Sequence, residues 1–375
     1  MLSCPHRPPC PGCPRFGEHG IDGEAHASLD GLARSHGLPP VEVISGQAAG
    51  FRLRARLAIR GRKSAPKLGL FAAGTHRVVT IPTCSVQHPL INHVAGVVRR
   101  ALVDADLPPY SDAADLGLVR YLQVVVERDT QTAQVVLVAN AGTPEPLSAC
   151  LDLIRDRLGS DLHSLWFNAH CGRDNAILGP RFTHWHGPVS VVERFGGAAV
   201  HYPPGAFGQS NLEIAARIIE HLREQIPQGA RVAEFYAGVG AIGLSVLERV
   251  SELRMNEVSP QSLQGLESGL AGLMPAERAR ISVFPGPAGA ACEAASGADV
   301  VIADPPRKGL DPALTDWLCA QPPQRLIYVS CGLESLQQDI LRLTAGGALR
   351  LTALTAFDLM PYTGHVETVA RFDRS

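Results

Sequence analysis

The feature that most constrains this fold is an alternation of strand-like and helix-like segments that runs from about residue 212 to the C-terminus. Short apolar runs such as Ala230–Gly238 and Arg325–Gly332 are separated by amphipathic stretches such as Pro260–Leu273. Strands that alternate with helices form a doubly wound, mostly parallel sheet, so we predict an α/β, Rossmann-like domain here. Ligands of such sheets bind beyond the carboxyl ends of the strands, where we expect the functional residues.

The preceding part of the chain has a different pattern. Residues 46–84 read as short strands, and residues 88–105 have apolar positions at helical spacing. Two further strands flank a turn at residues 128–132, and a helix follows at residues 144–159. These elements predict an α+β central domain. The predicted organisation is a Cys-rich segment with a β-rich part at 1–90, the central domain at 91–200 and the Rossmann-like domain at 201–375.

Composition argues against several classes of protein. The 375 residues carry a net charge of −2 at pH 7, so overall basicity does not single out a nucleic acid as the partner. No apolar run approaches the ~20 residues that span a bilayer, and the N-terminus lacks the apolar region of a signal peptide. We expect a cytoplasmic protein that acts as a monomer and does not enter the membrane.

Arginines gather between Phe51 and Lys67. Their alternation with apolar residues in RLRARLAIR predicts a strand with one arginine-rich face. Two interpretations remain open, a solvated strand face and a local patch that contacts phosphates.

The nine cysteines do not suggest a disulfide framework in a cytoplasmic protein. Cys4, Cys10 and Cys13 lie among prolines, in a segment that cannot form a regular helix or strand. Such a loop makes sense if its thiolates bind a metal, and both zinc and iron–sulfur sites usually need four ligands. Cys84, after a strand-like stretch, is the best candidate for the fourth. Spacing alone does not distinguish zinc from an iron–sulfur cluster.

A glycine-rich loop follows the first strand of the Rossmann-like domain. Gly238 and Gly240 belong to a G-x-G-x-x-G pattern, which lets the backbone approach a ligand closely. Glu234, just before the glycines, favours a positively charged or amine-bearing ligand. Glu257, at the end of the next strand, is placed for a ribose diol. The pattern suits NAD or FAD as well as S-adenosylmethionine.

Two later strand ends narrow the choice. Asp304 precedes Pro305 and Pro306, which stiffen the turn and hold the carboxylate over the ligand crevice. A dehydrogenase has no use for this loop. Cys331 ends the following strand, so we expect it beside Asp304 at the same sheet edge, and the C-terminal stretch brings Glu367 toward that edge.

A thiol and a carboxylate near a methyl donor suit methylation of C5 of a uracil, which is by itself a poor nucleophile. Addition of a thiolate to C6 makes C5 electron-rich, so that C5 can take a methyl group from a sulfonium. A base then removes the C5 proton, and the thiol leaves by elimination. The chemistry needs one cysteine and one base on opposite sides of the ring.

The stretches GQSN, DPPRKGL, VSCGLESLQQD and GHVETVARFD resemble the motifs of the RNA uracil-5-methyltransferases, which make 5-methyluridine in tRNA and 23S rRNA. The resemblance covers nearly the whole chain and implies a class I methyltransferase domain that uses S-adenosylmethionine, with a central domain that binds RNA. By this similarity, Cys331 is the nucleophile and Glu367 the general base. The implied cofactor contacts are Gln209, Tyr236, Glu257 and Asp304, beside the glycine-loop residues Gly238 and Gly240.

The resemblance also bears on the metal and the substrate. Cys4, Cys10, Cys13 and Cys84 match the [4Fe-4S] ligands of the ribosomal members, and the tRNA enzyme typically lacks them. The resemblance therefore implies an iron–sulfur cluster rather than zinc, and 23S rRNA rather than tRNA. One departure is Gly332, where the family often has Asn after the catalytic cysteine. The alternatives are a tRNA uracil-5-methyltransferase and a non-catalytic iron–sulfur RNA-binding protein on the same fold.

Overall fold

The computed structural model describes residues 3–375, which form two compact units. The first unit comprises residues 3–14, 47–193 and 202–212, and the second comprises residues 15–46, 194–201 and 213–375. The predicted ranges 1–90, 91–200 and 201–375 do not coincide with these units, because the chain passes between them several times. The strand pairing described below is the physical reason.

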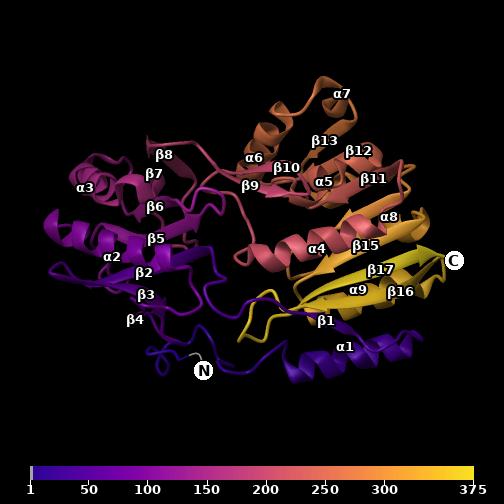
Figure 1. Ribbon diagram of the computed structural model, residues 1–375, viewed down its shortest axis with the longest axis horizontal. Coiled ribbons are helices and arrows are strands. Elements are labelled where there is room, and N and C mark those ends of the chain that lie inside the picture. Colours follow the sequence, from indigo (N-terminus) through magenta and orange to yellow (C-terminus); the bar gives the residue numbers. More distant parts are fainter. Residues whose placement is uncertain (1–2) are drawn as a thin grey trace. The chain divides into compact units, whose positions relative to one another are not determined.

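The second unit is built, within the described residues, on an eight-stranded sheet, drawn mainly in orange and yellow in Figure 1. In spatial order its strands are β1 (Glu42–Ile44), β16 (Leu349–Phe357), β17 (Glu367–Arg374), β15 (Arg325–Ser330), β14 (Val300–Ala303), β11 (Ala230–Phe235), β12 (Val250–Glu257) and β13 (Ile281–Pro285). All are parallel except β17, which lies antiparallel between β15 and β16. This sheet confirms the predicted α/β, Rossmann-like fold.

Residues 15–46 belong to this second unit, although they were grouped with the N-terminal segment in the predicted organisation. The cause is β1, which extends the sheet edge by pairing in parallel with β16. A helix that was not predicted, α1 (Gly23–Ser35), precedes β1, and Asp22 caps it by accepting the backbone N–H groups of Glu24 and Ala25.

Helices cover both faces of the eight-stranded sheet. Besides α1, this unit contains α4 (Leu212–Gln225), α5 (Ala241–Ser245), α6 (Pro260–Ala271), α7 (Pro275–Arg278), α8 (Pro312–Ala320) and α9 (Leu333–Ala345). On one face, α1, α8 and α9 contribute Leu29, Leu314 and Ile340 to a shared apolar core. On the other face, the His221 ring of α4 lies 5.6 Å from the Phe357 ring of β16.

The first unit has a seven-stranded sheet among its described residues, drawn in purple and magenta in Figure 1. In spatial order its strands are β4 (Val78–Thr80), β3 (Ala65–Phe71), β2 (Arg54–Arg62), β5 (Val119–Val126), β6 (Ala133–Ala139), β7 (Leu162–Ala169) and β8 (Arg181–His186). Because β2 pairs with β5, residues 47–84 join the central domain rather than forming a domain with the Cys-rich segment.

Two helices pack on one face of this sheet, α2 (Pro89–Asp104) and α3 (Ser148–Leu158). α3 connects the parallel pair β6 and β7, whereas the other neighbouring strands are antiparallel. The α+β pattern predicted for the middle of the chain is therefore confirmed. A separate hairpin of β9 (Val191–Phe195) and β10 (Ala198–Tyr202) contains residues of both units. Among the helices of residues 3–375, none combines the length and apolarity needed to cross a bilayer.

β2 carries the predicted arginine-rich face, but its arginines mainly make internal contacts. Arg60 is only 6% exposed, and its Nε lies 2.6 Å from Oδ2 of Asp112. Arg54 donates to the Ala206 carbonyl oxygen at 3.3 Å. Arg56 is exposed and donates to Oε1 of Gln123 at 2.8 Å. Neither a solvated face nor a phosphate patch describes the whole strand, because Arg54 and Arg60 hold the unit together.

Candidate functional site

The loop after β11 brings the backbone close to the end of β12. Gly238 and Gly240 have φ values of +59° and +84°, a left-handed conformation that favours glycine. A Cβ on Gly240 would lie 2.7 Å from Cδ1 of Leu266, so a larger residue would also displace that side chain. The Gly238 N–H donates to Oε2 of Glu257 at 2.7 Å. The glycines singled out in the sequence therefore serve both loop geometry and the placement of Glu257.

Glu257 is the last residue of β12, and backbone groups fix its carboxylate. The N–H groups of Val258 and Ser259 donate to its Oε1 at 2.8 and 2.6 Å. Glu257 and Tyr236 line one cavity of about 320 Å³, which we call the Glu257 cavity. Its other walls come from the loops after β13 and β14. A cavity of this size, with Asn256, Glu257 and Asp311 among its lining residues, suits a small organic ligand.

Two further carboxyl groups, those of the buried Glu234 and the partly buried Asp304, lie at the same sheet edge. Burial raises the pKa of Glu234 well above its usual value, and the charges of Asp304 and Glu257 raise it further. Burial also raises the pKa of Asp304, which directly follows β14. A nearby cation stabilises the charged form of carboxyl groups whose pKa values are raised by burial. This part of the sheet edge therefore favours a positively charged ligand.

The strand register brings Cys331 and Glu367 to the same place. Ser330, the last residue of β15, pairs with Thr368 of the antiparallel strand β17. Cys331 is the next residue after Ser330, and Glu367 is the residue before Thr368. In this antiparallel register, Cys331 and Glu367 therefore lie opposite each other, one position beyond the Ser330–Thr368 pair. β14 pairs with β15 on its other side, which brings Asp304 to the same edge. The structure thus gathers the predicted thiol and both predicted carboxyl groups.

The electrostatics agree with this proximity. Burial raises the pKa of the Cys331 thiol, the negative charges of Glu367 and Asp304 raise it further, and Arg307 opposes them. Burial also raises the pKa of Glu367, which is 5% exposed, and Asp304 adds to the effect while Arg307 again opposes it. Cys331 is half-buried and lines a second cavity of about 490 Å³, the Cys331 cavity. A planar ring could reach the thiol from this cavity.

Two basic residues, Arg307 and Lys308, line the cavities at this sheet edge. Arg307 lines the Cys331 cavity, and its Nη2 lies 3.2 Å from Nε2 of His365. Lys308 lines both the Cys331 cavity and the Glu257 cavity. The signal was present in the sequence, since both residues directly follow the Asp-Pro-Pro turn. Their charges can offset the acidic groups or contact a phosphate.

Gly332 allows the loop of Arg307 to approach the end of β15. A Cβ at position 332 would lie 2.9 Å from the Arg307 carbonyl oxygen and 2.8 Å from Oγ of Ser335. A larger residue at this position would therefore require the Arg307 loop to move. The departure from the family pattern at this position matches the local packing in this chain.

Gln209 lies in the first unit, in the loop between β10 and α4. Side chains of the seven-stranded sheet hold this loop, since Gln123 donates to the Pro204 carbonyl oxygen at 2.7 Å and Arg54 donates to that of Ala206. Its predicted contact with the cofactor stays a prediction.

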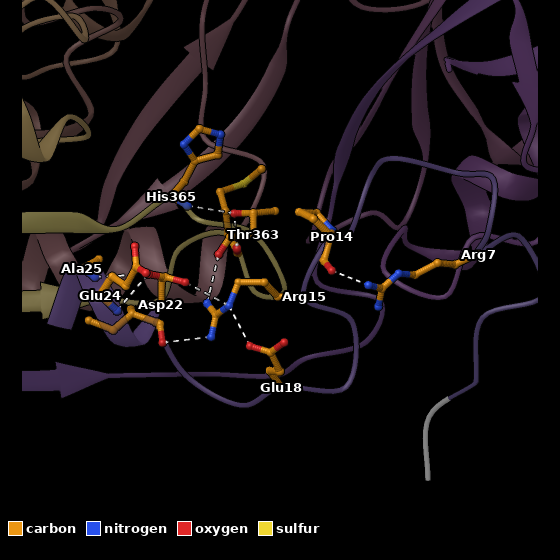
Figure 2. Close-up of polar contacts among 11 residues, drawn as sticks. Arg7, Pro14, Arg15, Glu18, Asp22, Glu24, Ala25, Thr363 and His365 are labelled. Carbon is orange, nitrogen blue, oxygen red and sulfur yellow. Dashed lines mark hydrogen bonds and ion pairs between the residues drawn. The ribbon is translucent and has the colours of Figure 1, made fainter. Parts of the chain in front are cut away.

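The four predicted metal ligands all lie in the first unit. Cys4, Cys10, Cys13 and Cys84 line one cavity of about 130 Å³, together with the side chain of Arg52. Burial raises the pKa of Cys13 to about 11, and the charges of the other three cysteines add to this. Thiols that influence one another in this way are close in space. Arg7 donates to the Pro14 carbonyl oxygen and so closes the loop of the Cys-rich segment (Figure 2).

Within the part of the chain that the structure describes, no group of three or more His, Cys, Asp or Glu side chains is arranged to hold a single metal ion. The four thiols share a cavity, but they do not converge on one point as the ligands of one zinc ion do. The four cysteines therefore line one cavity, and their role as ligands of a metal or an iron–sulfur cluster stays a prediction.

Comparisons with known proteins agree with this geometry. A family model described as tRNA (Uracil-5-)-methyltransferase matches residues 295–374, the segment that contains Asp304, Cys331 and Glu367. An RNA methyltransferase of Protochlamydia amoebophila is 33% identical over 381 residues, which span 100% of this chain and 98% of that protein. One of Gloeobacter violaceus is 28% identical over 369 residues, which span 94% of this chain and 76% of that protein.

A solved structure has a similar fold. It is the tRNA (uracil-54, C5)-methyltransferase of Pyrococcus abyssi in complex with S-adenosyl-L-homocysteine. The TM-score is 0.76 at 22% sequence identity, and the match covers 93% of this chain and 83% of the other. The two proteins therefore share an architecture that extends over both units.

Proposed function

Because this chain belongs to the RNA (uracil-5-)-methyltransferase family, we propose that it transfers a methyl group from S-adenosylmethionine to C5 of a uridine in 23S rRNA. The observation that carries this proposal is the register between β15 and β17. It brings Cys331 and Glu367 together at the sheet edge where Asp304 and the Glu257 cavity also lie. A thiol and a buried carboxyl group at one sheet edge are the two groups that C5 methylation needs.

In the proposed mechanism Cys331 acts first. Its thiol gives its proton to solvent water, and the resulting thiolate forms a bond to C6 of the uracil. The electrons of the C5–C6 double bond move onto C5 and the C4 carbonyl oxygen, which gives an enolate. C5 then forms a bond to the methyl carbon of the sulfonium, and the electrons of the broken carbon–sulfur bond stay on the departing thioether.

Glu367 completes the reaction. Its carboxylate takes the proton from C5, the C5–C6 double bond forms again, and the thiolate of Cys331 is expelled from C6. The raised pKa of Glu367 makes this carboxylate a stronger base than an exposed glutamate. Arg307, whose charge opposes the raised pKa values of both Cys331 and Glu367, stabilises the charged forms that the two steps require.

The Glu257 cavity is the proposed site of S-adenosylmethionine. Glu257 would accept hydrogen bonds from the ribose hydroxyl groups, and Tyr236 would contact the adenosine. The backbone of Gly238 and Gly240 would permit close approach of the cofactor. Asp304 and Glu234 favour the positive charge of the sulfonium and amino groups. The S-adenosyl-L-homocysteine in the Pyrococcus abyssi structure supports this class of ligand.

The choice of 23S rRNA rests on the four cysteines, which match those of the ribosomal members of the family. We expect purified protein with labelled S-adenosylmethionine to form 5-methyluridine at one position of unmodified 23S rRNA, and none in unmodified tRNA. Mass spectrometry of nuclease fragments would locate the methyl group. Methylation of tRNA alone would refute 23S rRNA as the substrate, and the proposed reaction mechanism would still hold. No methylation of either RNA by folded, cofactor-binding protein would favour the non-catalytic alternative.

We propose that Cys4, Cys10, Cys13 and Cys84 hold a [4Fe-4S] cluster. The cavity that the four thiols share supports this, and so does Arg52, which lines the same cavity and whose charge interacts with Cys13 and Cys84. A bound cluster would supply a covalent crosslink between the N-terminal loop and the segment after β4. Cytoplasmic localisation and a monomeric state also remain proposals.

The cluster proposal predicts the metal content of the protein. Protein purified without oxygen should contain about four irons and four labile sulfides per chain. Cys10→Ser should lose them, whereas Cys150→Ser, at a buried cysteine in the apolar core of the same unit, should keep them. Elemental analysis and the visible absorption spectrum would measure both. Stoichiometric zinc without labile sulfide in the wild type would instead establish the zinc alternative.

A further inference from the structure

The segment that precedes α1 is fastened to the loop between β16 and β17. The Arg15 N–H donates to the Tyr362 carbonyl oxygen at 3.0 Å, and its Nη1 donates to that of Thr363 at 3.2 Å. The ring of Phe16 lies 4.9 Å from the ring of Tyr362. Tyr362 has a φ of +66°, an unfavourable conformation for a tyrosine that surrounding contacts must maintain. Arg15 and Phe16 therefore contact Tyr362 itself and its neighbour Thr363.

The same guanidinium also reaches the start of α1, as Figure 2 shows. Its Nη2 donates to the Ile21 carbonyl oxygen at 3.2 Å, and its Nε lies 3.3 Å from Oδ2 of the helix cap Asp22. Glu18 adds a carboxylate at 2.8 Å from Nε. Arg15 has 16% of its side chain exposed, so these partners rather than water surround it. A guanidinium can hold several acceptors in fixed directions at once, which a lysine cannot do.

Both segments that Arg15 joins form walls of the Cys331 cavity. Ala25, in the first turn of α1, and His365, in the β16–β17 loop, line this cavity. Thr363 orders the end of that loop, because its Oγ1 accepts the N–H of His365 at 3.2 Å, as Figure 2 also shows. Glu367 follows His365 by two residues. A shift of the loop would therefore displace the wall of the cavity and the carboxylate together.

We propose that Arg15 is a positioning residue, which clamps the β16–β17 loop to the start of α1 and thereby fixes Glu367 relative to Cys331. The role of Glu367 in this inference rests on the proposed function. The clamp itself rests only on the contacts of Arg15. Arg15 does not touch the substrate in this scheme. It acts on the proton-removal step through the position of the loop, so its loss affects elimination more than substrate binding.

Hydrogen exchange tests the clamp without any assumption about activity. In Arg15→Ala, amide exchange of peptides covering residues 359–367 should become about tenfold faster, because the loop loses the guanidinium bond to the Thr363 carbonyl oxygen and keeps only the backbone bond to that of Tyr362. Peptides of β11 and β12 should exchange as in the wild type. Arg34→Ala removes an exposed arginine at the other end of α1 and serves as the matched control. Unchanged exchange of residues 359–367 in Arg15→Ala would overturn the proposal.

Kinetics test the positioning of Glu367. We expect kcat of Arg15→Ala to fall by about 10²-fold, with the KM for RNA changed much less, since small displacements of a reacting group have effects of this size. The covalent protein–RNA adduct should accumulate, and Arg15→Lys should restore only part of the rate. An equal fall in rate with no adduct and a raised KM would show a role in binding instead. A wild type without methyltransferase activity would refute the proposed function, and the exchange result would still decide the clamp.

Discussion

Cys331→Ala abolishes methylation of the RNA and leaves the affinity for S-adenosylmethionine nearly unchanged: this is the first result that we expect. The thiolate is the only group in the proposed mechanism that makes C5 nucleophilic, so no slower version of the same route remains. Two of the proposed cofactor residues, Tyr236 and Glu257, line the Glu257 cavity, which Cys331 does not line. Methyl transfer from labelled S-adenosylmethionine and calorimetric titration of the cofactor would measure the two effects.

Cys319→Ala is the matched control, because it removes a partly buried thiol from α8 of the same unit. This variant should keep full activity. Cys331→Ser should be as inactive as Cys331→Ala, since a hydroxyl group is a far weaker nucleophile than a thiolate. Substantial methylation by Cys331→Ala would exclude the covalent mechanism and leave the fold and the family assignment intact.

Glu367→Gln should have a different effect from Cys331→Ala. Addition to C6 and methyl transfer to C5 need no base, so both steps can proceed in this variant. Removal of the C5 proton fails, and turnover should fall by about 10² to 10⁴, the contribution typical of a general base. The variant should therefore accumulate a covalent protein–RNA adduct, which a denaturing gel would show as a slowly migrating band.

Glu267→Gln, at an exposed position on α6, should form no such band. RNA with 5-fluorouridine at the target position should trap the wild type in the same way, because fluorine cannot leave as a proton does. Cys331→Ala should not react with this RNA. Rapid turnover by Glu367→Gln would assign the proton removal to another group, of which Asp304 is the nearest candidate by charge interaction.

Much of the site could be predicted because parallel strands place their carboxyl ends at one sheet edge. The glycine loop follows β11, Glu257 ends β12, Asp304 directly follows β14 and Cys331 directly follows β15. Local patterns locate such positions reliably. Lys308 was missed as a wall of both cavities, because which loop residues point into a cavity depends on packing that the sequence does not display.

The organisation of the first part of the chain was harder to predict. The alternation in β2 correctly indicated a strand with arginines on one face, but Arg60 pairs with Asp112. An arginine whose partner is distant in the sequence has the same local pattern as one that faces solvent. For the same reason, no local signal assigned residues 15–46 to the C-terminal sheet, since the pairing of β1 with β16 joins segments at opposite ends of the chain.

By itself the sequence determined the elements of the Rossmann-like domain and the identities of the thiol and carboxyl groups, because strand periodicity and motif chemistry are local. The tertiary structure alone decided that β17 inserts antiparallel between β15 and β16, with Ser330 opposite Thr368. Shifting that register by one residue would turn Glu367 to the other face of the sheet. Hydrogen bonding between strands distant in sequence sets the register, and it is this pairing that brings Glu367 to Cys331.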